Sequence, residues 1–304
     1  MENVPGLVSM GNWAFLRTIS GALSKLGYDV EAKILYAAHY GVPQERWRLV
    51  IMGSRVGPVQ FPSPTHFAPG RPNFAGGRTM TFRHALRSDS NGSELLPFTT
   101  VAEAISDLPR LEPGQGSEKQ PYLSNRKPST YARELRRGSK VVSNHFAPRI
   151  AKVNRERVKF VPPGGSWRDI PFELLPKGMQ RARRSDHTKR YGRLTANGLS
   201  GTIMTKCDPH WGAVFLPDQD RTLSVREAAR LQSFPDHYAF RGPRVSQYTQ
   251  VGNAVPPLLA RAIALEVFAL LRSLSEDRRG FKTIRDHGTT ARKPVRRRTQ
   301  KAKA

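Results

Sequence analysis

The stretch VEAKILYAAHYGVPQERWRLVIMG, residues 30–53, indicates the fold of the chain. Residues 30–36 alternate well enough between apolar and polar side chains for a half-buried strand, and residues 49–52 form a short apolar run that ends at a glycine. The residues HYGVPQER between them have the composition of a loop. Upstream, residues 13–26 carry apolar side chains at three- and four-residue spacing, which predicts a helix closed by Gly27. Helix, strand, loop and strand together predict a fragment of an α/β layer.

Two further helices are predicted near the end of the chain. In RTLSVREAARLQSFPD, residues 221–236, Ser224 is a plausible N-cap and Glu227 stands three residues later, as in a capping box. The last helix is predicted to start near Pro256 or Pro257, because proline is tolerated in a first turn, and to continue through LLARAIALEVFALLRSL. Its apolar residues occupy most faces, so we expect it to be well buried against a larger body.

The middle of the chain is irregular and basic. From about Pro58 the sequence is rich in proline and glycine, and apart from a helix near residues 101–108 little periodicity survives until about residue 195. Between Arg126 and Arg193, nineteen Lys or Arg residues stand against five acids and are interleaved with aromatic residues. The whole chain has a formal net charge of +26, an excess that draws polyanions. We therefore predict a second domain here that binds nucleic acid.

Composition excludes several other classes of protein. The chain has 304 residues, 38% of them hydrophobic, which is enough for a real core. It contains no apolar run of eighteen residues and no signal-peptide pattern, so we expect a cytoplasmic protein with no membrane partner. The single cysteine, Cys207, rules out an internal disulfide framework. The eight histidines are scattered without thiol neighbours at ligand spacing, so no metal is predicted.

The C-terminus is a basic tail. From Arg272 to Ala304 twelve Lys or Arg residues stand against three acids. Such a composition cannot bury a core, and we predict disorder from residue 275. The alternative to a specific role is a solvated tail that only adds non-specific affinity for a polyanion.

Four segments, in order along the chain, carry a resemblance to one family. They are ENV at residues 2–4, YGVPQERWR at 40–48, RTLSVREAARLQSFPD at 221–236 and QVGNAVPPLLARAIA at 250–264. They resemble, in order and approximate spacing, the later motifs of the DNA cytosine-5 methyltransferases. PPGGSWRDIP and RLTANGLSGTI also look like the region between these motifs in bacterial members. The resemblance covers nearly everything but the tail.

The resemblance implies a fold and an activity. The fold class is α/β, with the C-terminal part of a Rossmann-like methyltransferase sheet plus a smaller irregular DNA target-recognition domain. The implied activity is transfer of a methyl group from S-adenosylmethionine to carbon 5 of cytosine in duplex DNA, in a restriction–modification system or as an orphan enzyme. A DNA substrate also implies association with the nucleoid.

The implied domain organisation follows the order of the motifs. Residues 1–57 are expected to form the C-terminal half of the catalytic α/β domain, and residues 58–195 the basic target-recognition domain. Residues 196–274 are expected to return to the catalytic domain with the closing helix. Residues 275–304 are the predicted disordered basic tail.

Glu2 is the residue that the resemblance assigns to the target base. In the family a cysteine thiolate adds to carbon 6 of cytosine, which makes carbon 5 nucleophilic. A glutamate in the flipped-base pocket promotes this addition by holding or sharing a proton at ring nitrogen N3. Asn3, Val4 and Pro5 would shape the turn that aims the glutamate. Taken alone, an acidic residue at an ordinary disordered terminus is the alternative.

Gln44, Arg46 and Arg48 match the family's Gln-x-Arg-x-Arg pattern. Alternation along an extended strand places the two arginines on one face, where a guanidinium can hold a phosphate or carboxylate. By resemblance Arg46 or Arg48 would steady the target nucleotide and the cysteine's transition state, and Gln44 would contact DNA. A solvated basic edge strand is the alternative.

The remaining implied site residues lie further along the chain. In GNAVPP, the resemblance assigns Asn253, Ala254 and Val255, after Gly252, to the pocket for S-adenosylmethionine; the alternative, a turn into a core helix, is compatible with that role. Basic residues of the middle domain are assigned to DNA, namely Arg183, Arg184, Lys189, Arg190 and Arg193.

Two motifs of the family are missing from this sequence. The family places a Gly-rich cofactor loop and a Pro-Cys nucleophile before the Glu-Asn-Val motif, and no Pro-Cys pair occurs here. Cys207 follows a lysine and is not expected to be the nucleophile. We therefore expect either a truncated or mis-started reading frame or one subunit of a split enzyme, inactive alone and completed by a separate chain that carries the N-terminal catalytic half.

Two other functions are compatible with the sequence. A catalytically dead DNA-binding module that uses only its basic domain would show salt-sensitive duplex binding and no rescue by the missing half. A basic RNA-binding or structural protein would show no preference for a defined DNA sequence.

Overall fold

The computed structural model describes residues 1–9, 11, 13–70, 94–122, 127–186 and 189–287, and for 275–287 only the backbone. Its first part contains β1 (Glu2–Asn3), α1 (Gly6–Ser9), α2 (Ala14–Lys25), β2 (Asp29–Tyr36), η1 (Ala37–Tyr40), β3 (Trp47–Ser54) and β4 (His66–Phe67). The middle contains β5 (Leu96–Pro97), α4 (Val101–Ile105), β6 (Gly116–Gln120), α5 (Thr130–Arg136), β7 (Val142–Phe146), α6 (Lys152–Val158), η2 (Trp167–Asp169), η3 (Phe172–Leu174), α7 (Lys177–Gln180) and β8 (Gly192–Arg193). The last part contains β9 (Ala213–Phe215), α8 (Val225–Leu231), α9 (Arg244–Asn253) and α10 (Pro257–His287).

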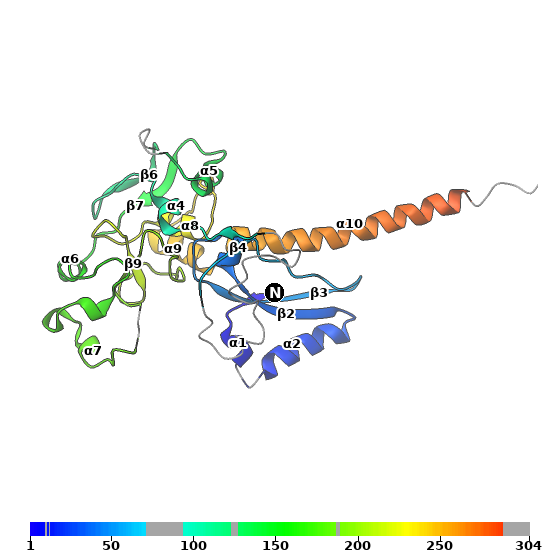
Figure 1. The fold of residues 1–304 in the computed structure, drawn as a ribbon, viewed down its shortest axis with the longest axis horizontal. Coiled ribbons are helices and arrows are strands. Elements are labelled where there is room, and N and C mark those ends of the chain that lie inside the picture. Colours follow the sequence, from blue (N-terminus) through cyan, green and yellow to red (C-terminus); the bar gives the residue numbers. More distant parts are fainter. Residues whose placement is uncertain (10, 12, 71–93, 123–126, 187–188, 288–304) are drawn as a thin grey trace, which may run out of the picture.

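A three-stranded antiparallel sheet forms the body that the quoted stretch predicted. Its order is β1-β3-β2, and β3 pairs with Glu2 opposite Val50 on one side and Leu35 opposite Arg48 on the other. The sheet lies between two helices, α2 on one face and α10 on the other (Figure 1). The predicted helix and both strands are thus confirmed, and the fold class is α/β.

The two faces of this sheet bury alternate residues. Ile34, Leu49 and Ile51 form a core with α1 and α2, whereas Leu35 and Val50 pack in the cluster that contains the buried start of α10. Alternation with a period of two therefore determines which side chains point toward α10.

The last helix is less buried than the sequence suggested. Leu259 is fully buried, but Leu265, Phe268 and Leu271 are 52%, 62% and 56% exposed. Figure 1 shows α10 leaving the sheet and extending away from the body. The expectation of a well-buried helix is therefore wrong for the face of α10 that carries Leu265, Phe268 and Leu271.

One apolar stretch of the described residues has the length of a membrane span. Residues 244–274 are long and apolar enough to cross a bilayer, with a mean hydropathy of 1.8 in an 18-residue window and 11% of that window buried. This stretch is not one continuous helix, because α9 ends at Asn253 and α10 begins at Pro257. The first part of α10 also carries Arg261, Glu266 and Arg272. We interpret the stretch as two helices of the folded domain.

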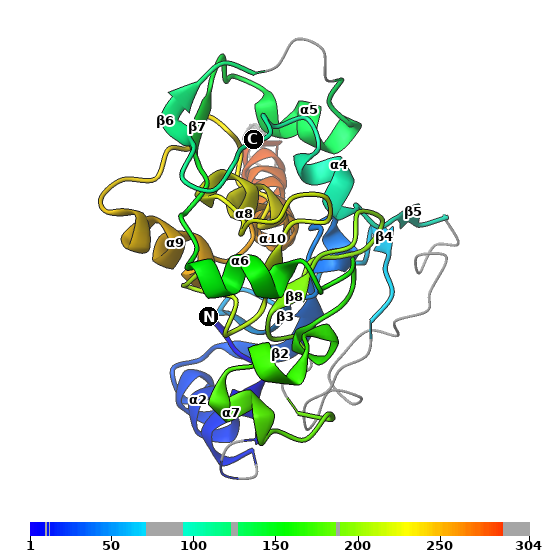
Figure 2. The same cartoon turned by 90° about the vertical axis from the view of Figure 1, so that its left-hand side faces the viewer.

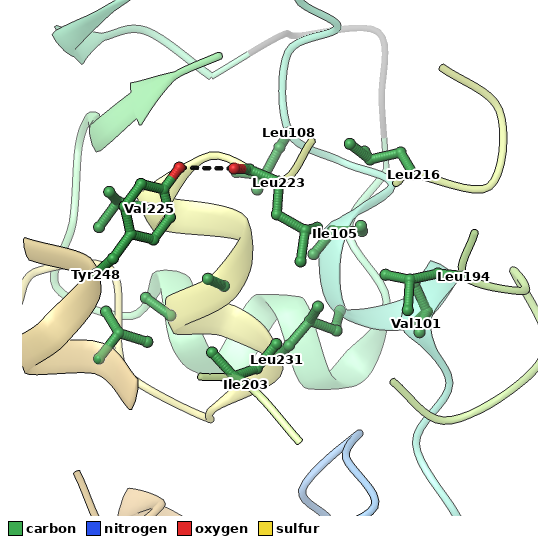
Figure 3. Close-up of a cluster of buried hydrophobic side chains, with 14 of the residues drawn as sticks. Val101, Ile105, Leu108, Leu194, Ile203, Leu216, Leu223, Val225, Leu231 and Tyr248 are labelled. Carbon is green, nitrogen blue, oxygen red and sulfur yellow. Dashed lines mark hydrogen bonds between the residues drawn. The ribbon is translucent and has the colours of Figure 1, made fainter. Parts of the chain in front are cut away.

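The largest hydrophobic core among the described residues lies outside the three-stranded sheet, in a second body that is named the recognition body after its expected role. This core contains residues from both sides of the predicted boundary at residues 195 and 196. Val101, Ile105 and Val142 from the middle of the chain pack against Leu223 and Leu231 from after that boundary. Figure 3 shows this cluster, in which the Tyr248 hydroxyl also donates to the Leu223 carbonyl at 2.7 Å. Helices α8 and α9 therefore pack with elements from the middle of the chain, and Figure 2 shows α8 beside β7 and α4. The predicted domain boundary at residues 195 and 196 stays a prediction.

The strand pairing also joins residues on the two sides of the predicted boundary at residues 195 and 196. β8 pairs in parallel with β9 across residue 195. At the other boundary, Val59 and Phe61 still pack with the core beneath α10. The predicted change of domain at residue 58 stays a prediction, because residues 71–93 lie outside the described part of the chain.

Helix α8 is held by buried ion pairs. Ser224 and Glu227 form the predicted capping box. Glu227 also accepts two hydrogen bonds from Arg221, both at 2.8 Å. Despite burial, which opposes ionisation, the Arg221 guanidinium lowers the pKa of Glu227 to about 2. On the next turn Arg230 contacts Asp107 and Asp236, at 2.6 Å each.

The tail differs from its prediction in part. Disorder was predicted from residue 275, whereas the backbone of α10 continues to His287. Residues 288–304 lie outside the described part of the chain, so their predicted disorder stays a prediction.

Candidate active site

Glu2 and Arg48 form an ion pair on the α10 side of the sheet. The Glu2 Oε1 atom lies 2.7 Å from Arg48 Nε, and their side chains are 27% and 13% exposed. The pairing of β1 with β3 brings the two side chains together, because Glu2 lies opposite Val50, two residues from Arg48 on the same face. Burial lowers the pKa of Arg48, and Glu2 opposes that shift.

An apolar cavity of about 580 Å³ lies beside this pair. Glu2 lines it together with Val50 and Met52 of β3, and Val255 forms part of the opposite wall. One side of α10 completes the lining, with Ala260, Ile263, Ala264, Val267, Leu270 and Leu271. The structure therefore brings the predicted base-contacting acid and one predicted cofactor residue to the same cavity.

The Arg46 side chain is more deeply buried than that of Arg48. Its side chain is 1% exposed and donates to the carbonyl of Ile203 at 3.1 Å. It also donates to the carbonyls of Gly252 and Ala254, at 2.9 and 3.1 Å. Burial, followed by repulsion from Arg48, lowers the pKa of Arg46 to about 9, while Glu2 raises it. The guanidinium therefore holds two distant loops, and its expected contact with the target nucleotide stays a prediction.

Gln44 is buried for a related reason. Its side chain is fully buried, donates to the Leu231 carbonyl at 3.1 Å and accepts from the Ile203 amide at 3.0 Å. Its amide also pairs with the side chain of Gln232. These partners leave no atom facing solvent, so the expected DNA contact of Gln44 is not supported. The residue instead ties the β2–β3 loop to the end of α8.

The turn that carries Asn253, Ala254 and Val255 is fixed from two sides. The Ala254 carbonyl accepts from Arg46 and also from Gln232 Nε2 at 2.8 Å. Gly252 comes so close to the backbone of Met204 that a Cβ atom would lie 2.4 Å from its carbonyl carbon. Asn253 itself is exposed, whereas Val255 borders the cavity.

The basic residues assigned to DNA fall into two groups. Arg193 is 8% exposed and donates to the carbonyls of Val161, Leu216 and Val158, so it has a structural role, and its expected DNA contact stays a prediction. The others lie at the surface or are partly exposed, namely Arg183, Arg184, Lys189 and Arg190. Lys189 pairs with Glu45, and Arg184 donates to the Arg168 carbonyl at 3.0 Å.

Cys207 is remote from this chemistry. It packs against the largest core, and its thiol donates to the Leu223 carbonyl at 3.4 Å. Burial raises the pKa of the thiol to about 12, so the thiolate is scarce at neutral pH. Sequence reasoning did not find Gln232, which contacts Gln44 and the Ala254 carbonyl, although its place four residues after Ala228 put it on the same side of the predicted helix.

Among the parts of the chain that the structure describes, no group of three or more His, Cys, Asp or Glu residues could hold a metal ion. The site instead offers one carboxylate, one guanidinium and an apolar wall. This set can hold a planar heteroaromatic ring and share a proton with it.

Comparison with solved structures identifies the class of fold. The chain superposes on a crystal structure of a putative DNA modification methyltransferase encoded within a prophage of E. coli, with a TM-score of 0.56 and 20% sequence identity. The superposition covers 89% of this chain and 68% of that one. The fold is therefore that of a Rossmann-like α/β methyltransferase.

Comparison of sequences identifies the family. Residues 1–269 match the family described as C-5 cytosine-specific DNA methylase. The chain is 31% identical over 312 residues to the Type II methyltransferase M.AgeI of Thalassovita gelatinovora, covering 87% of this chain and 71% of that protein. It is 32% identical over 294 residues to DNA (cytosine-5)-methyltransferase 3 of Arabidopsis thaliana. The chain belongs to the C-5 cytosine-specific DNA methylase family.

The matched lengths differ widely among the relatives. The chain spans 20% of the Arabidopsis protein and 18% of DNA (cytosine-5)-methyltransferase 1A of Oryza sativa subsp. japonica, to which it is 34% identical. It covers 56% of the Type II methyltransferase M1.HphI of Haemophilus parahaemolyticus, with 31% identity. The chain thus corresponds to a portion of most of these relatives.

Proposed function

We propose that this chain supplies the target-recognition body and the cytosine-holding side of an S-adenosylmethionine-dependent DNA cytosine-5 methyltransferase. The observation that carries the proposal is the Glu2–Arg48 pair at the cavity bordered by Val255. Family membership supports the reaction, and the net charge of +26 supports DNA as the substrate. The Type II names of the bacterial relatives favour a role in restriction–modification, at the nucleoid in the cytoplasm.

Glu2 and Arg48 have different roles at the target cytosine. The Glu2 carboxyl group holds or shares a proton at ring nitrogen N3, which lowers the barrier to attack at carbon 6. Arg48 fixes the Glu2 side chain through its Nε atom. Its Nη1 atom donates to the Trp47 carbonyl at 2.7 Å, and Nη2, which has no acceptor among the described residues, can donate to one on the nucleotide.

The residues present fit one wall of a site for the methyl donor. Val255 borders the cavity, and the turn that carries it is held by Arg46 and Gln232. S-adenosylmethionine, when bound, supplies an electrophilic methyl group. The role of this chain is to position Val255 and to exclude water with the apolar side of α10.

The attacking thiolate must come from another segment. Cys207 is the one cysteine among the 304 residues, and it packs in the core of the recognition body. Leu265 and Phe268 on α10, 52% and 62% exposed, form an apolar surface of the kind that a further strand or helix of the catalytic layer buries. We infer that the chain is inactive alone and that a segment with the Gly-rich and Pro-Cys motifs completes it, in a longer protein or as a separate chain.

Complementation tests this proposal. The 304-residue chain is incubated with duplex DNA and labelled S-adenosylmethionine, with and without the part of M.AgeI that lies outside the matched region. We expect 5-methylcytosine only when both segments are present. Robust methylation by the chain alone contradicts the assignment, and duplex binding without any rescue favours a catalytically dead DNA-binding module.

A further inference from the structure

Trp211 is a large apolar side chain displayed at the surface of the recognition body. It is 55% exposed and lies in the loop between β8 and β9. An isolated exposed aromatic residue costs hydration free energy, and tryptophan rings at protein surfaces are typical of contact sites. The residues around this ring therefore indicate what kind of molecule it contacts.

The loop that carries Trp211 is held firmly. The Trp211 amide donates to the Asp208 carbonyl at 3.0 Å, and the His210 amide donates to the Asp208 side chain at 2.9 Å. The buried Tyr191 amide donates to the Pro209 carbonyl at 2.6 Å. These bonds order the loop before any partner binds, which reduces the entropy lost on binding.

Other flat and cationic groups surround the ring. The Arg190 guanidinium lies 5.2 Å from the Trp211 ring centroid, within the range of a cation–π contact. The His210 ring meets Trp211 edge to face at 5.2 Å, and Tyr191 supports His210 in the same way at 6.1 Å. One side of the indole is thus braced by protein, while more than half of the side chain remains accessible.

A cavity of about 480 Å³ opens beside Trp211. It is lined by Trp211, Lys189 and Thr202, and on the sheet side by Tyr36 and Trp47, whose rings stack at 4.1 Å. The cavity therefore combines aromatic surfaces with a basic residue, Lys189, which forms an ion pair with Glu45, another lining residue. This combination is typical of surfaces that hold the bases and phosphates of nucleic acid.

The cavity reaches the strand that carries Arg48, on the opposite face from the Glu2–Arg48 pair, because neighbouring residues of a strand point to opposite faces. Trp47 lies between Arg46 and Arg48 in the sequence, and the cavity-lining Met204 follows Ile203, whose carbonyl accepts from Arg46. The ring of Trp211 thus stands on the recognition body, across a cavity from the strand that carries Arg48.

We propose that Trp211 stacks on a DNA base next to the position that the target cytosine vacates. Arg190 contacts the neighbouring phosphate and braces the ring. This inference rests on the proposed function, because a base leaves the helix only if the chain acts on an extrahelical cytosine. Stacking on an aromatic ring needs no particular base, so Trp211 contributes affinity for a distorted duplex rather than sequence readout.

The test compares an intact duplex with the same duplex containing one abasic site, which leaves a gap for the indole. Binding of the full chain is measured by fluorescence anisotropy for the native protein and for Trp211→Ala, Trp211→Phe and Arg190→Ala. Phe15→Ala is the matched control, because Phe15 is an equally exposed aromatic residue, at 51%, on the distant helix α2.

The native chain is expected to prefer the abasic duplex. Trp211→Ala should weaken that complex by about 5- to 100-fold and binding to the intact duplex by less than about threefold, with Trp211→Phe in between. Arg190→Ala should weaken both complexes alike and reduce the salt dependence by about one phosphate contact.

Three results would overturn the inference. If the native chain binds both duplexes equally, or if Trp211→Ala binds the abasic duplex as the native chain does, Trp211 does not stack on DNA and the proposed function is untouched. If the native chain binds neither duplex, the proposed function fails together with the inference.

Discussion

The Glu2 carboxylate lies 2.7 Å from Arg48 Nε, and this pair joins the first strand of the sheet to its central strand. Backbone bonds support the same junction, since the Met1 amino group donates to the Ile51 carbonyl at 2.7 Å and the Ile51 amide donates to the Met1 carbonyl at 2.9 Å. The acid is thereby fixed in position at the cavity wall. A carboxyl group held in one place can keep the short distance that sharing a proton with a bound base requires.

Replacement of Gly252 by alanine is expected to destabilise the fold. A Cβ atom at this position would lie 2.4 to 2.5 Å from backbone atoms of Met204 and Thr205, which cannot yield as a flexible side chain does. We expect Gly252→Ala to lower the free energy of unfolding by about 2 kcal/mol or more, measured by urea denaturation. Gly21→Ala on α2, where nothing lies within 4 Å, should instead be neutral or stabilising. Equal stability of the two variants would contradict the close approach.

Arg46 is expected to act as a positioning residue. Lysine cannot bridge the carbonyls of Ile203, Gly252 and Ala254 together, so Arg46→Lys should lower the free energy of unfolding by about 2 to 4 kcal/mol. The salt dependence of DNA binding should remain that of the native chain. Arg55→Lys, at an exposed position, is the control. An Arg46→Lys chain of native stability that loses one phosphate contact would restore the role expected from sequence.

Cys207 is expected to be chemically inert in the folded chain. Because burial raises its thiol pKa to about 12, iodoacetamide at pH 8 should label it slowly in the native protein and rapidly in urea. Intact-mass spectrometry measures both rates. Cys207→Ala should also leave the activity of the complemented enzyme unchanged. Fast native labelling, or loss of activity in the variant, would show that the thiol is accessible or catalytic.

The Arg221–Glu227 pair is expected to make stability depend on acid pH. The folded-state pKa of Glu227 is about 2, below its ordinary value of 4.5, so the pair stabilises the fold above pH 4.5. That contribution should disappear as the pH falls from 4.5 toward 2. Glu227→Gln should therefore be less stable than the native chain at pH 6 but lose less stability over this interval, measured by denaturation at each pH. Glu31→Gln, at an exposed position of β2, is the control, and parallel pH curves for the native and Glu227→Gln chains would contradict the pair's role.

Local sequence patterns predicted the elements of the sheet better than they predicted the burial of charge. The alternation in residues 30–36 and the capping box at Ser224 are determined by neighbouring residues, and both appear in the structure. Gln44 and Arg46 look like surface residues from their type alone. Their partners are carbonyls and amides of loops more than 150 residues away, and only tertiary packing brings these together.

The packing of α8 against distant elements could not be predicted from local sequence for the same reason. The motif at residues 221–236 follows the irregular segment, so its return to regular structure suggested a return to the catalytic layer. In the structure, Arg230 on α8 binds Asp107, and the helix becomes the centre of the recognition body. Ion pairs that span more than a hundred residues leave no local pattern in the sequence.

The rate of methyl transfer by the complemented Glu2→Gln chain tests the central claim most directly. A single turnover on duplex DNA is compared for the native chain, for Glu2→Gln and for the control Glu31→Gln, each with the same completing segment. Loss of the shared proton at N3 should lower the Glu2→Gln rate by about a hundredfold or more while DNA affinity stays within about threefold of native. A Glu2→Gln rate equal to that of the native chain would contradict the assignment of Glu2 to the cytosine pocket.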